Sequence, residues 1–384
     1  GWMGGCCEAS ISHGEPNAEA RWPEETGTLR RLGYENLDAI EKFIADNNLD
    51  AEFERNGAIS VANEAYQTEW LGESDDPNVI ALDAEKVRKR INSPTFLGGD
   101  YSPHENANVH PAKLAAELAR HAASIGVEIY EQTPVTRLDG AADVPIQLTT
   151  DRGTIAAERV ALCTNVFPSL LKRYRFHTIP VYDYVLMTEP LTDEQLASIG
   201  WEGREGLSDL ANQFHYSRLT KDNRILWGGY DAVYHAGGRI KREYEDRMES
   251  HRKLASHFFT TFPQLAGVKF THRWAGVIDS STRFCAFFGQ AHGGRVQYVA
   301  GFTGLGVGAT HFAADVMVDR FEGRVTERTE LKMVKDMPLP FPPEPAAAIG
   351  VNMFRWAFDR ADHNGGKRNF FLKAMDAVGF GFDS

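Results

Sequence analysis

The sequence is poor in cysteine and has no long apolar run. Its 384 residues include four cysteines, and no two of them have the CxxC spacing typical of metal and redox sites. This excludes a disulfide framework, and we expect reduced thiols in the cytoplasm. No stretch approaches the roughly 18 consecutive apolar residues of a membrane span, and the first residues lack the basic and apolar regions of a signal peptide. We therefore expect no membrane span.

Basic residues are outnumbered, and motifs for metal binding and hydrolysis are missing. Lys and Arg total 41 against 53 Asp and Glu, a formal net charge of −12. So acidic a chain argues against nucleic acid or an anionic membrane as the main partner. The 13 histidines form no HExxH motif, and no GxSxG turn is present. The sequence therefore predicts neither a metal site nor a hydrolase triad.

The composition is that of a globular protein, and two kinds of hydrophobic pattern are present. The length predicts two or three domains. Helical spacing predicts helices over 28–48 and 111–125, with a strand expected at 127–130. The apolar run over 159–164 predicts a strand buried on both faces, as in an α/β sheet. Alternation predicts an antiparallel α+β layer in the middle of the chain, with strands at 181–189, 214–219, 225–230 and 268–277.

The strongest chemical signal is a strand that runs into a glycine-rich turn and then a helix. A strand at 296–300 precedes Gly301, Gly304, Gly306 and Gly308, and a helix follows. Glycines let backbone N–H groups approach a ligand, and a helix N-terminus favours anionic groups. The spacing departs from the GxGxxG fingerprint of a first NAD-binding βαβ unit. The turn is either a cofactor loop of another kind, which we favour, or a tight packing turn.

Polar and aromatic residues cluster on the middle strands. Alternation puts Tyr216 and Arg218 on one face of a strand, and Tyr230 and Arg273 lie in neighbouring segments. A guanidinium can hold a carboxylate with two hydrogen bonds, so these four residues are candidates for substrate binding. The alternative is an ordinary half-buried sheet face with aromatic packing.

Several segments taken together resemble one family. They are NVHPAKL from residue 108, GVEIYEQTPV at 126–135, VALCTN at 160–165, YSRLTKDNRILWGGY at 216–230, RWAGVID at 273–279 and GFTGLGVG at 301–308. The chain resembles the FAD-dependent oxidoreductases of the D-amino-acid-oxidase superfamily, in the branch of glycine, sarcosine and gamma-glutamylputrescine oxidases. The resemblance implies an α/β, Rossmann-like FAD-binding domain built from discontinuous pieces, with an antiparallel α+β sheet domain covering the flavin.

The resemblance also implies boundaries and residue roles. Residues 1–56, 106–180 and 272–335 would form the FAD-binding domain, 57–105 and 181–271 the substrate domain, and 336–384 a Pro-rich linker and C-terminal segment. Cofactor contacts are expected at Gly1, Trp2, Val135, Thr164, Asn165, Gly304, Leu305, Gly306 and Val307. Gly4-Gly5 is an alternative match for the family loop otherwise ascribed to Gly1-Trp2.

The implied activity is FAD-dependent oxidation of a C–N bond in an amine or amino acid. Hydride would pass to the flavin, the imine would hydrolyse, and O2 or another acceptor would reoxidise the cofactor. Hydride loss requires no protein acid or base, so we assign no catalytic residue. We expect non-covalent FAD, with Cys163 and Cys285 as buried core thiols. A NAD-dependent dehydrogenase is the rival enzyme class.

One departure from the family pattern is large. Members begin with a strand, a GxGxxG turn and a helix, and this chain begins at Gly1 with none of these. The expected missing portion is on the order of 60 residues, which would carry the first βαβ unit and the pyrophosphate site. We therefore expect an N-terminally truncated chain that binds FAD poorly by itself, with a non-catalytic product as the alternative.

Overall fold

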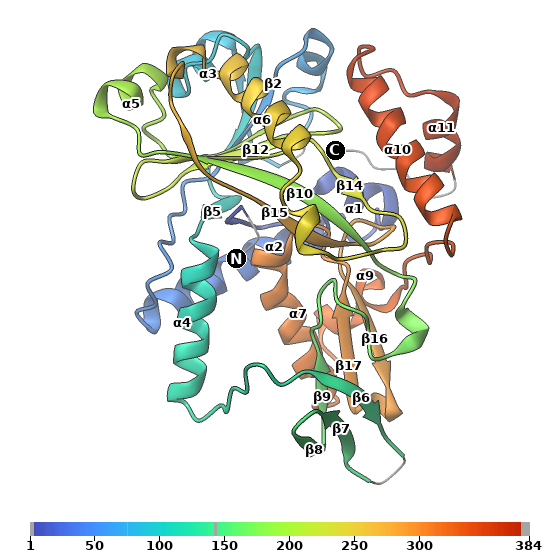
Figure 1. Ribbon diagram of the computed structural model, residues 1–384. Helices are drawn as coiled ribbons and strands as arrows, with labels where there is room; N and C mark the ends of the chain where they lie inside the picture. The colour runs from blue at the N-terminus through green and yellow to red at the C-terminus, as the bar shows by residue number, and fades with distance from the viewer. Residues whose placement is uncertain (1–3, 75, 142–143, 378–384) are drawn as a thin grey trace.

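The computed structural model describes residues 4–74, 76–141 and 144–377. Its largest feature is a nine-stranded sheet in the order β14-β10-β13-β12-β11-β2-β4-β3, with β15 also paired to β10 (Figure 1). The pairs are antiparallel except for β2 with β11, which are parallel. The strands are β2 (Ala58–Ala62), β3 (Ile80–Asp83), β4 (Gly98–Ser102), β10 (Ile179–Thr188), β11 (Gly206–Asp209), β12 (His215–Leu219), β13 (Ile225–Gly229), β14 (Val233–Tyr234) and β15 (Phe270–Ser280).

Three helices cover one face of this large sheet, which we call its outer face. They are α3 (Ala84–Arg90), α5 (Asp193–Ile199) and α6 (Met248–Thr261). Helix α3 begins at Asp83, whose carboxylate accepts a hydrogen bond from the Lys86 N–H at 2.9 Å. Leu254 and Phe258 lie one turn apart on α6 and are buried in the same apolar cluster as Trp227 of β13. The apolar stripe of α6 thus determines which side of the sheet becomes core.

A smaller sheet, in the order β16-β17-β9, forms a second unit with its own core. Its strands are β16 (Phe287–Ala291), β17 (Val296–Ala300) and β9 (Val160–Leu162), and β17 runs parallel to β9. Helices α2 (Thr26–Asp46) and α7 (Gly306–Phe321) pack together, with Leu29 and Val316 in one buried cluster. A third sheet of β6 (Val135–Asp139), β7 (Ile146–Thr150) and β8 (Gly153–Ala157) lies at the lower end in Figure 1.

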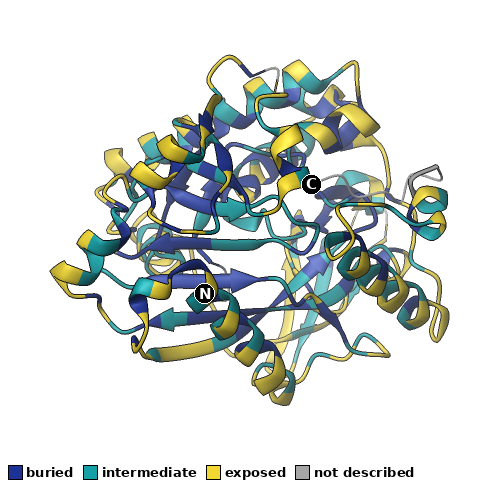
Figure 2. Cartoon of the chain, turned by 90° about the horizontal axis from the view of Figure 1, so that it is seen from above, coloured by how far each residue is buried: buried dark blue, intermediate teal, exposed yellow. Residues whose placement is uncertain are grey.

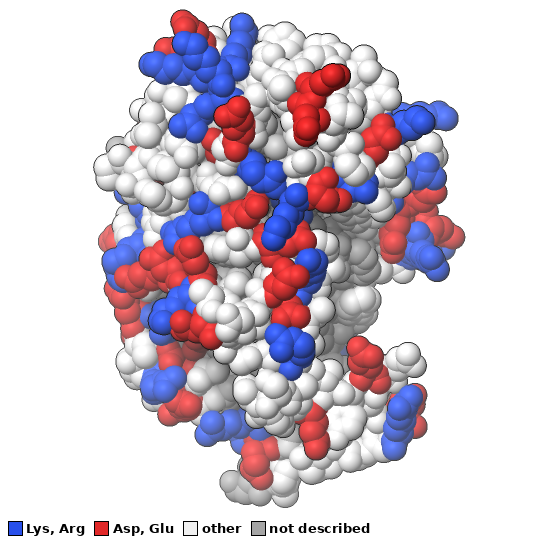
Figure 3. All heavy atoms as spheres, turned by 90° about the vertical axis from the view of Figure 1, so that its left-hand side faces the viewer, with Lys and Arg blue, Asp and Glu red and all other residues white. Residues whose placement is uncertain are grey.

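Short elements complete the described fold. Strand β1 (Cys6–Glu8) pairs antiparallel with β5 (Asn106–Asn108). The remaining α-helices are α1 (Glu15–Arg21), α4 (Pro111–Ser124), α8 (Glu327–Glu330), α9 (Lys332–Lys335), α10 (Ala346–Asp362) and α11 (Phe370–Ala377). Seen from above, buried residues gather on the central strands and exposed ones on the surrounding helices (Figure 2). On the face shown in Figure 3, acidic and basic side chains are interspersed. Within the described ranges, no helix is long and apolar enough to cross a membrane.

The strongly periodic segments are confirmed. The helix predicted over 28–48 is α2, the one from residue 111 is α4, and the predicted strands of the middle layer are β10, β12, β13 and β15. The layer is antiparallel, as predicted, apart from the β2–β11 pair. The boundary placed at residue 272 falls inside β15, which pairs with β10 along its whole length.

Three local predictions are wrong. Residues 127–130 form no strand, and Val127, Ile129 and Tyr130 are 50 to 67% exposed. Strand β9 covers only Val160–Leu162, and Ala161 is exposed between two buried neighbours, so burial on both faces does not occur. Cys163, which follows β9, is exposed rather than buried, while Cys285 is buried as predicted.

Helix α2 supplies a sharp test of the packing. A Cβ on Gly33 would overlap the carbonyl oxygen of Ala9, just after β1, whereas a Cβ on Gly27 of the same helix would meet no atom within 4 Å. We expect Gly33→Ala to lower the free energy of unfolding by about 1–3 kcal/mol, because backbone must move. Gly27→Ala is the matched control and should be neutral or slightly stabilising. Urea unfolding of both variants measures this, and equal effects would contradict the close α2–β1 crossing.

Candidate functional site

The glycine-rich turn between β17 and α7 is held by a buried carboxylate. Asp279 of β15 is 3% exposed, and its Oδ2 accepts a hydrogen bond from the Gly301 N–H at 2.6 Å. The Asp279 carbonyl accepts a second one from the Thr303 N–H at 3.3 Å. Burial raises the pKa of Asp279 to about 6, although the backbone N–H groups favour its ionised form. One residue of the large sheet thereby determines the path of the turn in the smaller unit.

The start of α7 has free N–H groups and open space beside it. Gly301, Thr303 and Gly304 have φ of 81°, 50° and 98°, so the chain turns sharply there before the helix. Among the described residues, no side chain caps this helix. A Cβ on Gly304 would meet no atom within 4 Å. The uncapped N–H groups and the helix dipole give this point a positive potential.

Strand β1 lies directly against the first turn of α7. A Cβ on Gly308 would be 2.7 Å from the Glu8 carbonyl oxygen, so only glycine allows the strand so close. Asn36 of α2 donates from Nδ2 to the Gly308 carbonyl at 3.1 Å. Helix α2 thus fixes the position of α7 relative to β1, and through β1 that of the preceding Gly4-Gly5 segment.

Gly4 and Gly5 lie against the inner face of the large sheet, opposite α6. A side chain on Gly4 would clash with the Tyr216 ring, and one on Gly5 would lie 2.9 Å from the Arg218 guanidinium. Arg218 is 5% exposed and donates from Nε to the Gly4 carbonyl at 2.6 Å. The structure therefore brings Tyr216 and Arg218 together, as predicted, and places Gly4-Gly5 beside them. Gly1 and Trp2 lie outside the described residues.

Tyr216 is held by a short hydrogen bond and a glycine. Its hydroxyl donates to Asp183 Oδ2 of β10 at 2.5 Å. Burial raises the pKa of Asp183 to about 6, and burial together with the Asp183 charge raises that of Tyr216 well above its usual value. The opposite strand has Gly228 here, where a Cβ would be 2.6 Å from the ring. Tyr216 therefore remains a protonated donor in a fixed orientation.

Glu8 is a site residue that sequence reasoning missed. Its side chain is exposed, but surrounding protein atoms limit its hydration, and together with the Glu105 charge they raise its pKa to about 7. Cys7 on the same strand is fully buried, so alternation directs Cys6 and Glu8 to the other side. A three-residue strand gives too short a pattern to reveal this from sequence.

Tyr230 and Arg273 do not lie on the same face of the sheet as Tyr216 and Arg218, so the four candidate residues are not brought together. Arg273 is paired in register with Leu186, whose side chain is buried in the outer core, and it binds Asp246 instead, with Nε–Oδ1 at 2.9 Å. Tyr230 follows the end of β13, and positive φ values of 101° at Gly229 and 62° at Tyr230 interrupt the alternation. Its ring stacks on His215, on the outer face.

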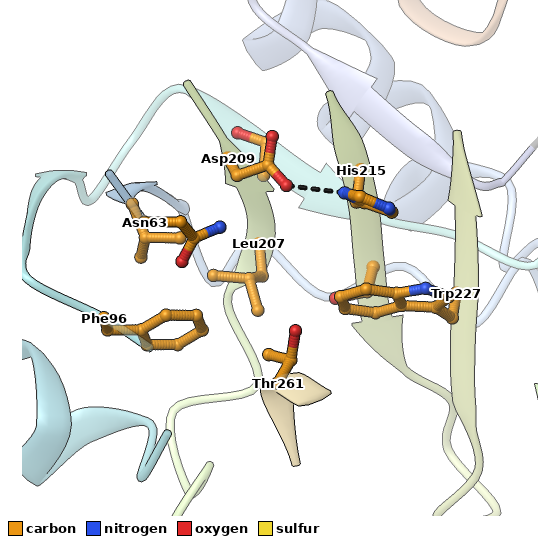
Figure 4. A pocket seen from close by; sticks show the side chains of 10 residues that line it. Asn63, Phe96, Leu207, Asp209, His215, Trp227 and Thr261 are labelled. Carbon is orange, nitrogen blue, oxygen red and sulfur yellow. Dashed lines mark hydrogen bonds and ion pairs between the residues drawn. The ribbon is translucent and has the colours of Figure 1, made fainter. Parts of the chain in front are cut away.

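The outer face near Tyr230 contains a small cavity that cannot hold a substrate. His215 hydrogen-bonds Asp209 at 2.7 Å (Figure 4). Its other ring nitrogen hydrogen-bonds His257 of α6 at 2.9 Å. The cavity beside it, lined by Trp227 and Phe96, has a volume of about 10 Å³. That is room for one water-sized molecule, far below the roughly 300 Å³ of small-molecule sites. No group of three or more His, Cys, Asp or Glu in the described part of the chain could hold a metal.

The other predicted cofactor residues occupy two places. Parallel pairing of Leu162 with Tyr298 puts Thr164, Asn165 and the Gly301 turn at the carboxyl ends of β9 and β17, where ligands of α/β sheets bind. Leu305, Gly306 and Val307 begin α7 beside β1. Val135 begins β6 of the separate three-stranded sheet. The Gly301 turn therefore lies at the same end of the smaller sheet as Thr164 and Asn165, whereas Val135 lies on β6 of a separate sheet.

The Asp279 anchor makes a prediction with a definite sign. The folded pKa of about 6 lies above the usual 3.8, so the native state holds the proton more tightly and stability falls as pH rises from about 4 to 6. Asp279→Asn cannot ionise. The free energy of unfolding of the wild type minus that of the variant should therefore decrease by up to about 3 kcal/mol across this window. Urea unfolding at several pH values measures the difference, and a constant difference would refute the shift.

Comparisons with known proteins agree with this geometry. The chain is 28% identical over 312 residues to gamma-glutamylputrescine oxidoreductase of Escherichia coli, covering 77% of this chain and 69% of that protein. It is 24% identical over 327 residues to the probable oxidoreductase OrdL of Haemophilus influenzae, covering 81% and 69%. Glycine oxidase from Geobacillus kaustophilus shares the fold with a TM-score of 0.67 and 19% identity, over 85% of each chain.

Iminodiacetate oxidase from Chelativorans also shares the fold, with a TM-score of 0.68 and 15% identity over 88% of each chain. The sequence profile of the FAD-dependent oxidoreductase family, DAO, matches residues 2–320, which is most of the chain. The match includes the β17–α7 turn and the strands that carry Asp183, Tyr216 and Asp279. The chain therefore belongs to the DAO family of FAD-dependent oxidoreductases.

Proposed function

We propose that this chain oxidises a C–N bond of an amine or amino acid with FAD as electron acceptor. The observation that carries the proposal is the uncapped start of α7 beside β1, together with Gly4-Gly5, which precede β1 and contact Tyr216 and Arg218. Named relatives and fold neighbours support the substrate class, since they are a gamma-glutamylputrescine oxidoreductase, a glycine oxidase and an iminodiacetate oxidase.

The residues present fit a flavin cofactor. A Cβ on Gly304 would project into open space, and the first N–H groups of α7 have no side-chain cap among the described residues. Gly304 to Val307 would hold FAD through backbone groups, and Thr164 and Asn165 would meet it at the strand ends. When bound, FAD supplies a two-electron acceptor for the C–H next to the amine nitrogen.

The residues of the protein would orient the substrate and stabilise the charge that develops during the reaction. The uncapped N–H groups of the α7 N-terminus stabilise negative charge without reorganisation, because Asp279 holds the Gly301 N–H of the preceding turn and Asn36 holds the Gly308 carbonyl of the first helical turn. The Tyr216 hydroxyl has a fixed orientation, since it donates a hydrogen bond to Asp183. Arg218 keeps its charge on the same face, where it orients the Gly4 carbonyl and favours a carboxylate-bearing substrate. The released imine would hydrolyse in water, and O2 or another acceptor would take the electrons.

A substrate panel with two matched tyrosine variants tests the proposal. Primary amines, N-methyl amines and amino acids are mixed anaerobically with FAD-reconstituted protein, and a substrate should bleach the flavin absorbance. Tyr216→Phe removes the hydroxyl that Asp183 holds, and kcat/KM should fall about tenfold or more, a change of roughly 1.4 kcal/mol in transition-state stabilisation. Tyr230→Phe alters the outer face and should leave kcat/KM within about twofold.

Two outcomes of this experiment would contradict the proposed function. FAD-loaded protein that stays coloured with every compound of the panel contradicts the proposal. Equal losses in Tyr216→Phe and Tyr230→Phe would show that the inner face of the sheet has no special part in the reaction.

A further inference from the structure

A second pocket lies on the outer face of the large sheet, between α6 and β15. Its volume is about 350 Å³, within the range of about 300–1,000 Å³ found for small-molecule sites. It is lined by Leu186, Met248, His251, Arg252, Ala255, Phe270, Thr271, His272 and Arg273. Tyr216 and Arg218 lie on the opposite side of the sheet, so this pocket is separate from the proposed flavin site.

The floor of the pocket is apolar. Leu186 of β10 is 3% exposed and belongs to the outer core, and Phe270 packs against the same core. Met248 and Ala255 of α6 lie two turns apart and form the opposite wall, with Met248 41% exposed. An unbranched thioether adapts to a bound apolar group, so these four side chains suit an alkyl or aryl body.

The rim carries an uncompensated positive charge. Arg273 is held by Asp246, with Nε–Oδ1 at 2.9 Å and Nη2–Oδ2 at 3.0 Å. Arg252 is exposed and forms no ion pair with any residue in the described ranges. Two guanidinium groups therefore face one carboxylate, which leaves one charge of +1 at the mouth of the pocket.

A buried histidine at the same place adds an independent observation. His251 is 3% exposed, and its polar neighbours are the backbone of Glu245 and the carboxylate of Asp246. Its Nε2 lies 3.8 Å from Asp246 Oδ1, and its ring meets the edge of Tyr184. Its position beside the rim indicates a polar site rather than simple core packing.

We propose that this pocket binds a small organic monoanion, a carboxylate carried on a short apolar body. Arg252 would hold the carboxylate with two parallel hydrogen bonds, the geometry that a guanidinium prefers. The apolar body would lie on Leu186, Phe270 and Met248. A cation is disfavoured by the net charge of the rim, and a bare inorganic anion leaves the apolar floor uncovered.

Binding of hexanoate to the full chain, followed by isothermal titration calorimetry, tests the proposal without reference to FAD or turnover. Wild type should bind hexanoate saturably and more tightly than either inorganic phosphate or hexan-1-ol. Arg252→Ala should raise the Kd about tenfold, because a charge-assisted contact is lost. Arg242→Ala, an exposed arginine outside the pocket, should leave the Kd unchanged.

A second variant tests the apolar space of the pocket without removing the Arg252 charge. Ala255→Phe fills the space between α6 and the floor and keeps Arg252, and it should also weaken hexanoate binding. Circular dichroism shows whether each variant is folded as the wild type is. Hexanoate that binds equally to wild type and Arg252→Ala, or phosphate that binds as tightly as hexanoate, overturns the proposal.

Discussion

The hydrogen bond from Gly301 to the Asp279 carboxylate is the contact on which the candidate site depends. Asp279 belongs to β15 of the large sheet, whereas Gly301 begins the turn between β17 and α7 of the smaller unit. The acceptor is buried, so its replacement leaves a backbone N–H without a partner in a place that water does not reach. The sharp turn of Gly301, Thr303 and Gly304 follows from this anchor, and the direction of α7 follows from the turn.

Glycines then permit the close approaches that bring the layers together. Gly33 allows α2 to pack against the Ala9 carbonyl, Gly308 allows β1 to lie on α7, and Gly4 allows the chain to contact the Tyr216 ring. Each contact would be blocked by a single methyl group against backbone or ring atoms. The segment before β1 is consequently held between the smaller unit and the inner face of the large sheet, and this is where the proposed chemistry takes place.

The two faces of the large sheet have different roles because side chains alternate along a strand. Asp183, Tyr216 and Arg218 lie on the inner face, and their neighbours Tyr184, His215 and Trp227 pack outward under α6. The outer face buries the apolar core, and its edge between α6 and β15 still leaves a pocket with a charged rim. The two proposed sites thus lie on opposite faces of one sheet and share no side chain.

The sequence by itself determined the elements with strong periodicity and the family. Apolar spacing identified α2 and α4, alternation identified β10, β12 and β13, and the glycines after β17 identified the turn before α7. The exposure of Ala161 in β9 and the lack of a strand at 127–130 could not be predicted, since apolar composition does not show whether another element packs against the segment. The placement of Tyr230 depended on two positive φ values, and that of Arg273 on register with Leu186. Which residues meet was decided by tertiary structure alone, because pairing, register and turn conformation act between segments far apart in the chain.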